Sequence, residues 1–462
     1  MLHDDRLFPA DPSTRAIAQR LYSRVAALPI ISPHGHTSPR WFALDEPFPD
    51  PAQLFVAADH YVFRMLYSQG IPLERLGIGS PALEDPRAVW RLFAEHYYLF
   101  RATPTRLWLD FAFEKIFALD ARLSPSNADA YFDAISEKLR DPAFRPRALY
   151  QKFHIEVLAT TDSPLDSLAD HEAIRSSFPA ARILPTFRPD TVADPDFPFF
   201  HDNVARLGEI TSTDTSNYRG FLAALRQRRQ DFKALGCTAT DHGHPSAATA
   251  DLTHDAAARL YQKILTRASS PDDHELFRAQ ILTEMAAMSL DDGLVMQIHP
   301  GSFRNHNAHL LSRFGRDVGA DIPTPTDYVR ALHPLLSRFG NEPRLSLILF
   351  TLDESAYSRE LAPLAGHYPC LKLGPAWWFH DSPEGMMRFR EWTTETAGFY
   401  NTVGFNDDTR AFLSLPARHD VARRVDCSFL ARLVAEHRLD EDEAHELSAA
   451  LAYGLAKRAY RL

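Results

Sequence analysis

Cysteine is scarce in this chain of 462 residues, because only Cys237, Cys370 and Cys427 are present and they are far apart. They form no Cys-x-x-Cys pair, so neither a cysteine zinc site nor a disulfide framework is expected. Long apolar runs are also missing, and the charged first residues lack the apolar core of a secretion signal. These absences predict a soluble protein of the reducing cytoplasm with no membrane partner.

Basic residues are also fewer than acidic residues. The chain has 50 Lys and Arg against 60 Asp and Glu, which gives a net charge of −10. A chain of this sign is not expected to bind nucleic acid or an anionic membrane surface. A small anionic ligand stays compatible with it, because a few well-placed arginines can dominate the local field.

Short apolar runs rich in β-branched residues recur along the chain, and each ends in polar or ionisable residues. Segments with helical periodicity lie between most of them, for example 255–282 and 327–339. This alternation predicts parallel strands, and eight units predict an α/β fold, a (β/α)8 TIM-like barrel with its chemistry at the carboxyl ends of the strands. The predicted strands are Leu28–His36, Ile155–Ser163, Arg182–Asp190, Cys237–His244, Leu294–Ser302, Leu345–Glu354, Cys370–Phe379 and Asn401–Arg410.

The uneven spacing of these strands predicts the domain organisation. Residues 1–39 are expected to hold an N-terminal helix and the first strand, and residues 151–462 the rest of the barrel. The stretch 40–150 is rich in aromatic and helix-forming residues and is punctuated by prolines. We interpret it as a large helical insertion after the first strand, lying over the barrel mouth. A smaller helical insertion is predicted at 191–235.

The first predicted strand ends in two histidines, His34 and His36. Side chains on a strand alternate between its faces, so these two imidazoles are expected to converge above the strand end, where they suit an ion such as Zn²⁺. Asp408, at the end of the eighth strand, becomes their neighbour when a barrel closes. It would complete a three-ligand site with positions left for water or substrate. Asp407 competes for this role, and Asp408 is alternatively a helix cap.

Other strand ends and the insertion carry further candidates. Arg188 and Arg410 each offer a rigid fork of donors that suits a carboxylate, although structural ion pairs are the usual use of arginine. His299 is a candidate proton carrier or substrate hydrogen-bond donor, with a core histidine as the alternative. The remaining candidates are His60, Tyr61 and Arg64 in the insertion, Asp241 and His242 at the fourth strand, and the pair Trp377 and Trp378 at the seventh, which suits either a sugar face or plain packing.

Together these motifs make the chain resemble the uronate isomerases, a divergent branch of the amidohydrolase superfamily. The matching stretches run in the family's order over nearly the whole chain, and the ordered set is highly specific. They are Leu-Pro-Ile-Ile-Ser-Pro-His-Gly-His-Thr-Ser-Pro (28–39), Asp-His-Tyr-Val-Phe-Arg-Met-Leu (59–66), Phe-Arg-Pro-Asp (187–190), Met-Gln-Ile-His-Pro-Gly-Ser-Phe-Arg-Asn (296–305), Gly-Pro-Ala-Trp-Trp-Phe (374–379) and Asp-Thr-Arg-Ala-Phe-Leu-Ser (408–414), followed by Arg418-His419 and Arg423-Arg424.

The resemblance implies a distorted (β/α)8 barrel that interconverts D-glucuronate with D-fructuronate, or D-galacturonate with D-tagaturonate, by proton transfer through an enediolate. It implies a divalent metal, expected to be Zn²⁺, and no nucleotide cofactor; a homo-oligomer is compatible with it. By motif position the metal falls to His34, His36 and Asp408, which favours Asp408 over Asp407. Catalytic or substrate roles fall to His60, Tyr61, Arg188, His299 and Arg410.

Three positions depart from the family pattern. Ser32 stands where members often have Asp, Ala411 replaces a serine, and Asp407 replaces a threonine. None of them is an inferred ligand, so the expected activity is retained while substrate preference and metal affinity stay open. Two alternatives are a metal-dependent hydrolase or decarboxylase on the same barrel, and a sugar-acid binding or sensor protein without turnover.

Overall fold

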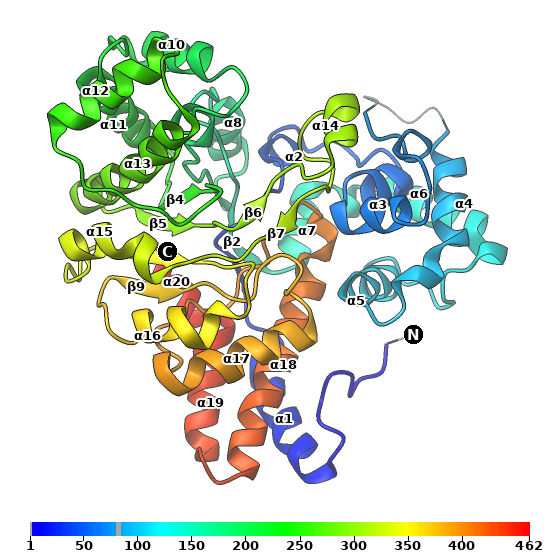
Figure 1. Ribbon diagram of the computed structural model, residues 1–462. Coiled ribbons are helices and arrows are strands. Elements are labelled where there is room, and N and C mark those ends of the chain that lie inside the picture. Colours follow the sequence, from blue (N-terminus) through cyan, green and yellow to red (C-terminus); the bar gives the residue numbers. More distant parts are fainter. Residues whose placement is uncertain (1, 80–84) are drawn as a thin grey trace.

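The computed structural model describes residues 2–79 and 85–462, and short parallel strands covered by helices lie at its centre (Figure 1). One sheet has the order β1-β2-β3 and a second has the order β4-β5-β8-β9, with parallel pairing throughout. The strands are β1 (Ile30–Ser32), β2 (Ile155–Ala159), β3 (Arg182–Leu184), β4 (Ala239–His242), β5 (Val295–Ile298), β8 (Leu347–Leu349) and β9 (Leu371–Leu373).

Single bridges extend these two sheets toward a barrel. Phe187 pairs with both Asp162 and Thr240, which joins the first sheet to the second, and Leu373 at the end of β9 pairs with Thr402. Neighbouring strands therefore follow the order of the chain. The predicted fold class, a distorted TIM-like α/β barrel, is confirmed, although regular strand pairing does not close the ring within residues 2–79 and 85–462.

The eighth predicted strand, 401–410, is wrong as a regular strand. Only Thr402 pairs with a neighbour, and the segment contains no named strand. Gly404 (φ +78°) and Asp408 (φ +37°) have left-handed backbone conformations, which interrupt the extended geometry that a ladder needs. The segment still takes the eighth place, because the backbone N–H of His36 donates to the Thr409 carbonyl oxygen at 3.0 Å.

The central strands are buried along their whole length. Every residue of β4, β5 and β8 is buried. A parallel strand covered by protein on both faces is apolar on both, so β5 and β8 show little polar alternation. Polar groups therefore gather where each strand ends, which is where the sequence places its ionisable residues.

Helices pack around this centre, and many begin with proline, which suits the first helical turn. In the described ranges, no helix combines the length and apolar character that crossing a membrane requires. The N-terminal helix α1 (Pro12–Val25) packs against the C-terminal helices. The other helices outside the β1–β2 connection are α8 (Ala169–Ser177), α9 (Asp190–Ala193), α10 (Phe200–Thr211), α11 (Tyr218–Ala234), α12 (His254–Leu265), α13 (Pro271–Asp292), α14 (Ala308–Phe314), α15 (Val329–Phe339), η7 (Tyr357–Leu361), α16 (Ala362–Ala365), α17 (Pro383–Ala397), η8 (Phe412–Ser414), α18 (Leu415–Ala435), α19 (Glu441–Ala449), η9 (Ala450–Gly454) and α20 (Leu455–Tyr460).

The connection between β1 and β2 is helical, and Figure 1 shows it in blue and cyan beside the barrel. Its aromatic core, which includes Trp90, Phe93 and Phe113, continues to Ile30 of β1 and Leu158 of β2. This shared core anchors the connection to the strands that begin and follow it. Its elements are α2 (Pro39–Leu44), η1 (Gln53–Ala57), α3 (His60–Tyr67), η2 (Leu73–Leu76), α4 (Pro86–Glu95), η3 (Tyr97–Phe100), α5 (Pro104–Phe111), η4 (Ala112–Ile116), η5 (Pro125–Asn127), α6 (Ala128–Leu139), η6 (Pro142–Phe144) and α7 (Pro146–Lys152).

A small antiparallel pair, β6 (Ser302–Phe303) and β7 (Ile322–Pro323), carries α14 on its connecting segment. In Figure 1 it lies between the green helices α10–α13 and the blue helix α3. Gly319 approaches α3 so closely that a Cβ there would lie 2.9 Å from the Phe63 ring. The connecting segment therefore rests directly on the helix that begins at His60.

Candidate functional site

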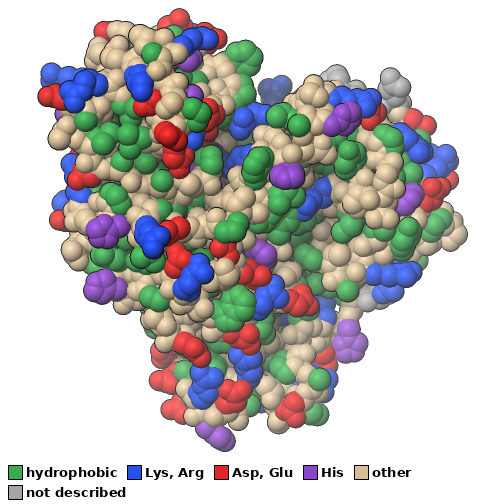
Figure 2. All heavy atoms as spheres, in the orientation of Figure 1, with side chains coloured by type: hydrophobic (Ala, Val, Ile, Leu, Met, Phe, Trp, Pro, Cys, Tyr) green, Lys and Arg blue, Asp and Glu red, His purple; other side chains and the backbone are tan. Residues whose placement is uncertain are grey.

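A cavity of about 840 Å³ opens at the carboxyl ends of the strands. It is bounded by residues of the β1–β2 connection on one side and by residues 190–197 on the other, and Figure 2 shows a hollow with basic side chains between the two upper groups of helices. Ten of the residues singled out in the sequence line it: His34, His36, His60, Tyr61, Arg188, His299, Trp377, Trp378, Asp408 and Arg410.

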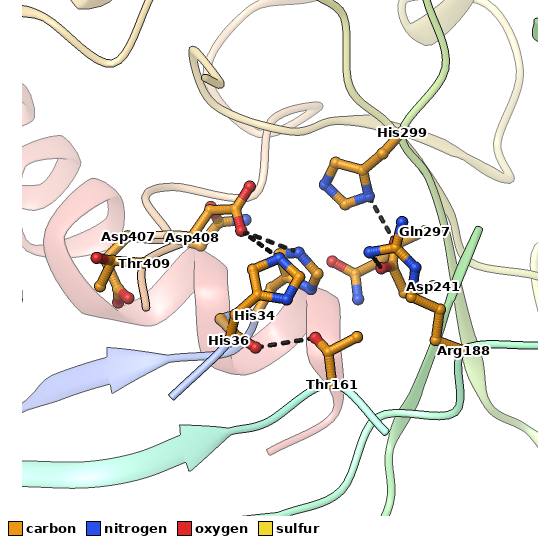
Figure 3. A network of polar contacts seen from close by, with 12 residues as sticks. His34, His36, Thr161, Arg188, Asp241, Gln297, His299, Asp407, Asp408 and Thr409 are labelled. Atoms are coloured by element: carbon orange, nitrogen blue, oxygen red, sulfur yellow. Dashed lines mark hydrogen bonds and ion pairs between the residues drawn. The ribbon is translucent and has the colours of Figure 1, made fainter. Parts of the chain in front are cut away.

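The two histidines after β1 converge on one carboxylate oxygen, as their spacing predicts. His34 Nε2 lies 3.3 Å and His36 Nε2 3.0 Å from Asp408 Oδ1 (Figure 3). His34 is buried, whereas His36 and Asp408 are partly exposed to the cavity. Asp408 Oδ1 has no well-aligned hydrogen-bond donor among the described residues. Two imidazole nitrogens therefore face one carboxylate oxygen, an arrangement of donors that fits a divalent cation.

The donor set also matches what zinc uses, namely imidazole nitrogen and carboxylate oxygen. His299 joins it, because ligand atoms of His34, His299 and Asp408 all lie within 4.8 Å of one another. The rings of His34 and His299 stack with centroids 4.6 Å apart. The residues present at this point can thus hold a metal ion with two or three protein ligands and still leave positions facing the cavity.

Local backbone geometry explains why Asp408 and its neighbour Asp407 have different surroundings. Asp408 has a left-handed φ of +37°, a conformation that Asp tolerates better than most residues. Its carboxylate faces the two histidines, while Asp407 Oδ2 lies 3.0 Å from His419 Nε2 in α18. The structure therefore supports Asp408 over Asp407 as the carboxylate of this site.

Charge holds the Asp408 carboxylate in its ionised form. Burial favours the neutral acid, but the nearby imidazole of His34 and the contact with His36 keep the pKa of Asp408 well below its usual range. For His36, burial dominates and lowers the pKa to about 4. An ionised carboxylate beside a neutral imidazole is the form in which both groups ligate a metal.

A second network of buried polar residues lies next to the cluster of His34, His36 and Asp408. His299 Nδ1 lies 2.6 Å from Asp241 Oδ1, and Arg188 Nη1 lies 3.0 Å from Asp241 Oδ2 (Figure 3). Burial favours the neutral form of Asp241, but Arg188 and His299 hold its pKa well below the usual range. Arg188 Nε also binds Asp190 Oδ2 at 2.8 Å. Arg188 thus lines the cavity while its guanidinium forms ion pairs with the carboxylates of Asp190 and Asp241.

Asp241 and His242 do not line the cavity, although we expected both to contact substrate. Asp241 instead contacts Arg188 and His299, as described above. His242 is completely buried and forms a cluster with Asp190 and His244, whose ligand atoms lie within 4.8 Å of one another. The Asp190 carboxylate accepts hydrogen bonds from Arg188 Nε and from the backbone N–H of Gly243, so its oxygens are occupied.

Arg410 differs from Arg188 in its surroundings. It is exposed in the cavity and forms no ion pair with any residue in the described ranges. Arg410 interacts electrostatically with Asp317, on the segment between β6 and β7: partial desolvation favours the neutral acid, but Arg410 and Arg304 lower the pKa of Asp317. His60 also faces Arg410, and burial with that positive charge lowers the pKa of His60 to about 4.

Residues 59–64 place two predicted groups at the cavity and one outside it. Asp59 caps α3 by accepting the backbone N–H of Tyr61 at 2.8 Å, which fixes His60 and Tyr61 in the first turn. Arg64, one turn later, does not line the cavity, and its guanidinium packs over the Phe379 ring at 4.4 Å. A substrate contact for Arg64 is therefore not supported, because its guanidinium packs on the Phe379 ring and not at the cavity wall, although Arg64 lies on the same face of α3 as His60.

The two tryptophans lie at the cavity wall by different contacts. Trp377 meets the His299 ring edge to face with centroids 4.7 Å apart, and Trp378 stacks on Phe379 at 4.8 Å. Both remain in contact with the cavity. Packing and a sugar-facing role are therefore compatible for this pair.

Several residues at the cavity were missed in the sequence. Asp381 follows the paired tryptophans, and Arg418 lies in the first turn of α18. Arg418 was within the family-like stretch Arg418-His419, and Asp381 lies just beyond Gly-Pro-Ala-Trp-Trp-Phe, so these motifs carried a signal. Arg304 lies in the family-like stretch 296–305, so that motif also carried a signal, whereas Arg316 and Asp317 come from the segment between β6 and β7, outside the quoted stretches.

Comparisons with known proteins agree over the whole chain. The glucuronate isomerase family model matches residues 12–460. A uronate isomerase of Rhizorhabdus wittichii is 67% identical over 461 residues, covering 100% of this chain and 98% of that protein. The crystal structure of glucuronate isomerase from Caulobacter crescentus is 59% identical with a TM-score of 0.98, covering 100% of this chain and 97% of the other.

A more distant solved structure shows how far the fold is kept. The uronate isomerase from Thermotoga maritima is only 27% identical, yet its TM-score is 0.93, with coverage of 100% of this chain and 99% of that one. The ordered motifs, the cavity at the strand ends and these matches agree. The chain belongs to the glucuronate isomerase family and is an isomerase.

Proposed function

We propose that this isomerase interconverts the aldose and ketose forms of hexuronates, either D-glucuronate with D-fructuronate or D-galacturonate with D-tagaturonate, through an enediolate. The observation that carries the proposal is the pairing of two features in one cavity. An ionised carboxylate, Asp408, lies beside two imidazoles, and Arg410, which forms no ion pair with any described residue, lies two residues away. The first suits proton transfer at an aldehyde end, and the second suits a substrate carboxylate.

The metal in this proposal is Zn²⁺, held by His34, His36 and Asp408. His299 is close enough to serve as a further ligand. When bound, the ion would supply positive charge that stabilises negative charge developing on the reacting oxygens. The hydrolase or decarboxylase alternative is not favoured, because the family match and the closely related chains are isomerases.

Proton transfer would fall to residues at the same end of the cavity. Asp408 would accept a proton from a substrate hydroxyl and return it. His60 is neutral at physiological pH, since its pKa is about 4, so it can accept a proton, and Tyr61 lies next to it in the first turn of α3. Trp377 and Trp378 would cover a face of the sugar chain.

Two of the cavity arginines, Arg188 and Arg410, are given different tasks in this proposal. Arg188 is bound to Asp241 and Asp190, so its charge is largely compensated and its fork is occupied. Arg410 is exposed and unpaired within the described residues, so it is the better group for a substrate carboxylate. Arg188 would instead hold Asp241 and, through it, His299 in place.

The domain arrangement serves this function in our proposal. Residues 40–150 would act as a unit that brings His60 and Tyr61 over the barrel mouth, and residues 191–235 would wall the opposite side. The ligand would be a small-molecule uronate. Self-association stays a prediction.

The test uses the purified protein with and without added Zn²⁺, incubated separately with D-glucuronate and D-galacturonate and assayed for the ketose. Turnover of either sugar is expected, and the ratio gives the preference. Arg410→Met should raise KM by about 10- to 100-fold, the loss expected from one hydrogen bond to a charged group. An unchanged KM would remove Arg410 from carboxylate binding, and no turnover of either sugar would overturn the proposal.

A further inference from the structure

Tyr61 belongs to a three-residue network that connects the cavity to α18. Its hydroxyl donates to Asp381 Oδ1 at 2.7 Å, and Arg418 Nη1 donates to Asp381 Oδ2 at 2.7 Å. Asp381 and Arg418 are both buried, and all three residues line the cavity. The Arg418 guanidinium lies 3.5 Å from the centre of the Trp108 ring. The network is therefore held by protein contacts on the side away from the cavity.

The direction of the Tyr61 hydrogen bond limits what Tyr61 can do. A phenol has one O–H to donate, and this proton is committed to Asp381. The backbone N–H of Phe379 donates to the Tyr61 oxygen at 2.8 Å, which uses a lone pair. Toward the cavity the oxygen can then only accept. Burial and the Asp381 charge also raise the pKa of Tyr61 well above its usual value, so the phenol stays neutral at rest.

Arg418 connects this network to the carboxylate at the metal-binding point. Its Nη1 also donates to the Asp407 carbonyl oxygen at 3.2 Å, and its Nε donates to Ser414 Oγ at 3.1 Å. Asp407 directly precedes Asp408. One guanidinium thus fixes both Asp381 and the backbone that presents Asp408, so the two proton-accepting sides of the cavity keep a constant separation.

We infer that Tyr61 and Asp381 form a two-proton relay, in which Asp381 positions the Tyr61 hydroxyl and takes its proton when Tyr61 accepts one from the substrate. This inference rests on the proposed isomerase function. In the forward step a substrate O–H bond breaks and its proton moves to the Tyr61 oxygen, while the Tyr61 proton moves to Asp381. In the reverse step Asp381 returns its proton to Tyr61 and Tyr61 protonates the other sugar oxygen. No proton is gained or lost in the cycle.

The chain contains a matched control for this network. Tyr97 donates to Asp110 Oδ1 at 2.8 Å, Arg106 Nε binds Asp110 Oδ2 at 2.8 Å, and the Arg106 guanidinium lies 3.9 Å from the centre of the Tyr97 ring. The same three residue types make the same tyrosine–aspartate and arginine–aspartate hydrogen bonds in η3 and α5, but none of them lines the cavity. A purely structural contribution should therefore be similar in the two networks.

The test compares Asp381→Asn with Asp110→Asn in the metal-loaded protein. Asparagine keeps an oxygen that accepts the tyrosine hydrogen bond but cannot take the proton. Asp381→Asn should lower kcat about 100-fold, within the range of general acid–base catalysis, with little change in KM. The dependence of kcat on the deuterium fraction of the solvent should change from curved, for two moving protons, to linear. Asp110→Asn should change neither.

A double-mutant cycle with Tyr61→Phe separates the relay from a direct role of Asp381. If Asp381 acts only through Tyr61, Asp381→Asn should add nothing to the loss caused by Tyr61→Phe. An additive loss, or a kcat of Asp381→Asn near that of the unchanged protein, would overturn the relay. If Asp381→Asn does not fold by circular dichroism, Tyr61→Phe alone decides, because a curved solvent dependence there contradicts the relay. Absence of turnover in the unchanged protein would instead count against the proposed function.

Discussion

Two clusters in this molecule use the same residue types but differ in how their carboxylates are engaged. The strand-1 cluster consists of His34, His36 and Asp408, and the strand-4 cluster consists of Asp190, His242 and His244. In the first, the carboxylate oxygen has only imidazole nitrogens beside it, within the described residues, and it faces the cavity. In the second, the carboxylate already binds Arg188 and a backbone N–H.

We infer from this comparison that the free oxygen of the carboxylate, rather than the residue types, marks the strand-1 cluster as the better place for a metal. Both clusters contain two histidines in a His-x-His pattern. The ligand atoms of Asp190, His242 and His244 all lie within 4.8 Å of one another, and His34 and His36 both approach Asp408 Oδ1. His242 and His244 are completely or almost completely buried and do not line the cavity. A cation there would have to displace the guanidinium of Arg188 from Asp190, which costs a buried ion pair.

The largest difference between the two clusters is expected in the kcat of their variants. Asp408→Asn should lower kcat by about 1000-fold, because it removes both an anionic ligand and a proton acceptor while keeping the shape and the left-handed backbone that Asn tolerates. His244→Asn is the matched change in the strand-4 cluster and should leave kcat nearly unchanged. Steady-state kinetics with circular dichroism as the folding control measures both. Activity of Asp408→Asn near that of the unchanged protein would remove Asp408 from the mechanism.

The second difference between the two clusters is expected in the amount of zinc that their variants retain. His36→Gln should weaken zinc binding by more than about 10- to 100-fold, the loss typical for a residue that only supports a ligand. His242→Gln should retain one bound ion per chain. Elemental analysis after dialysis against a graded chelator series gives both affinities. Loss of an ion from His242→Gln would show that the strand-4 cluster also binds metal and would reverse the comparison.

The smallest expected effect concerns acid stability. Burial lowers the pKa of His242 to about 3, so between pH 6.5 and 3 the unfolded chain holds a proton there that the native state lacks. Native stability contributed by this residue is therefore lost as the pH falls through that range, by up to about 1.4 kcal/mol per pH unit. Denaturant titrations of His242→Gln should show a shallower fall below pH 6.5. An unchanged slope would mean that His242 is protonated in the native protein.

Much of the fold and part of the site could be predicted from patterns that act locally. Alternating apolar runs locate strands, and a His-x-His pair at a strand end places two imidazoles together, so His34, His36 and Asp408 were found. The irregular segment after Thr402 was not foreseen, because its left-handed turns at Gly404 and Asp408 depend on packing across the barrel. Asp381 and Arg418 were missed because each lies beyond a strand end and meets Tyr61 only in the folded chain.

The closeness of His34 and Asp408 has a consequence for the synthesis of the protein. One lies near the beginning of the chain and the other near its end, and Thr409 accepts the backbone N–H of His36. A nascent chain on the ribosome therefore cannot assemble this ion-binding point until nearly all of it has emerged. A cation that binds only the assembled state adds to its stability by mass action. Metal loading would thus stabilise only chains that already contain both His34 and Asp408, and shorter nascent chains would gain nothing from the ion.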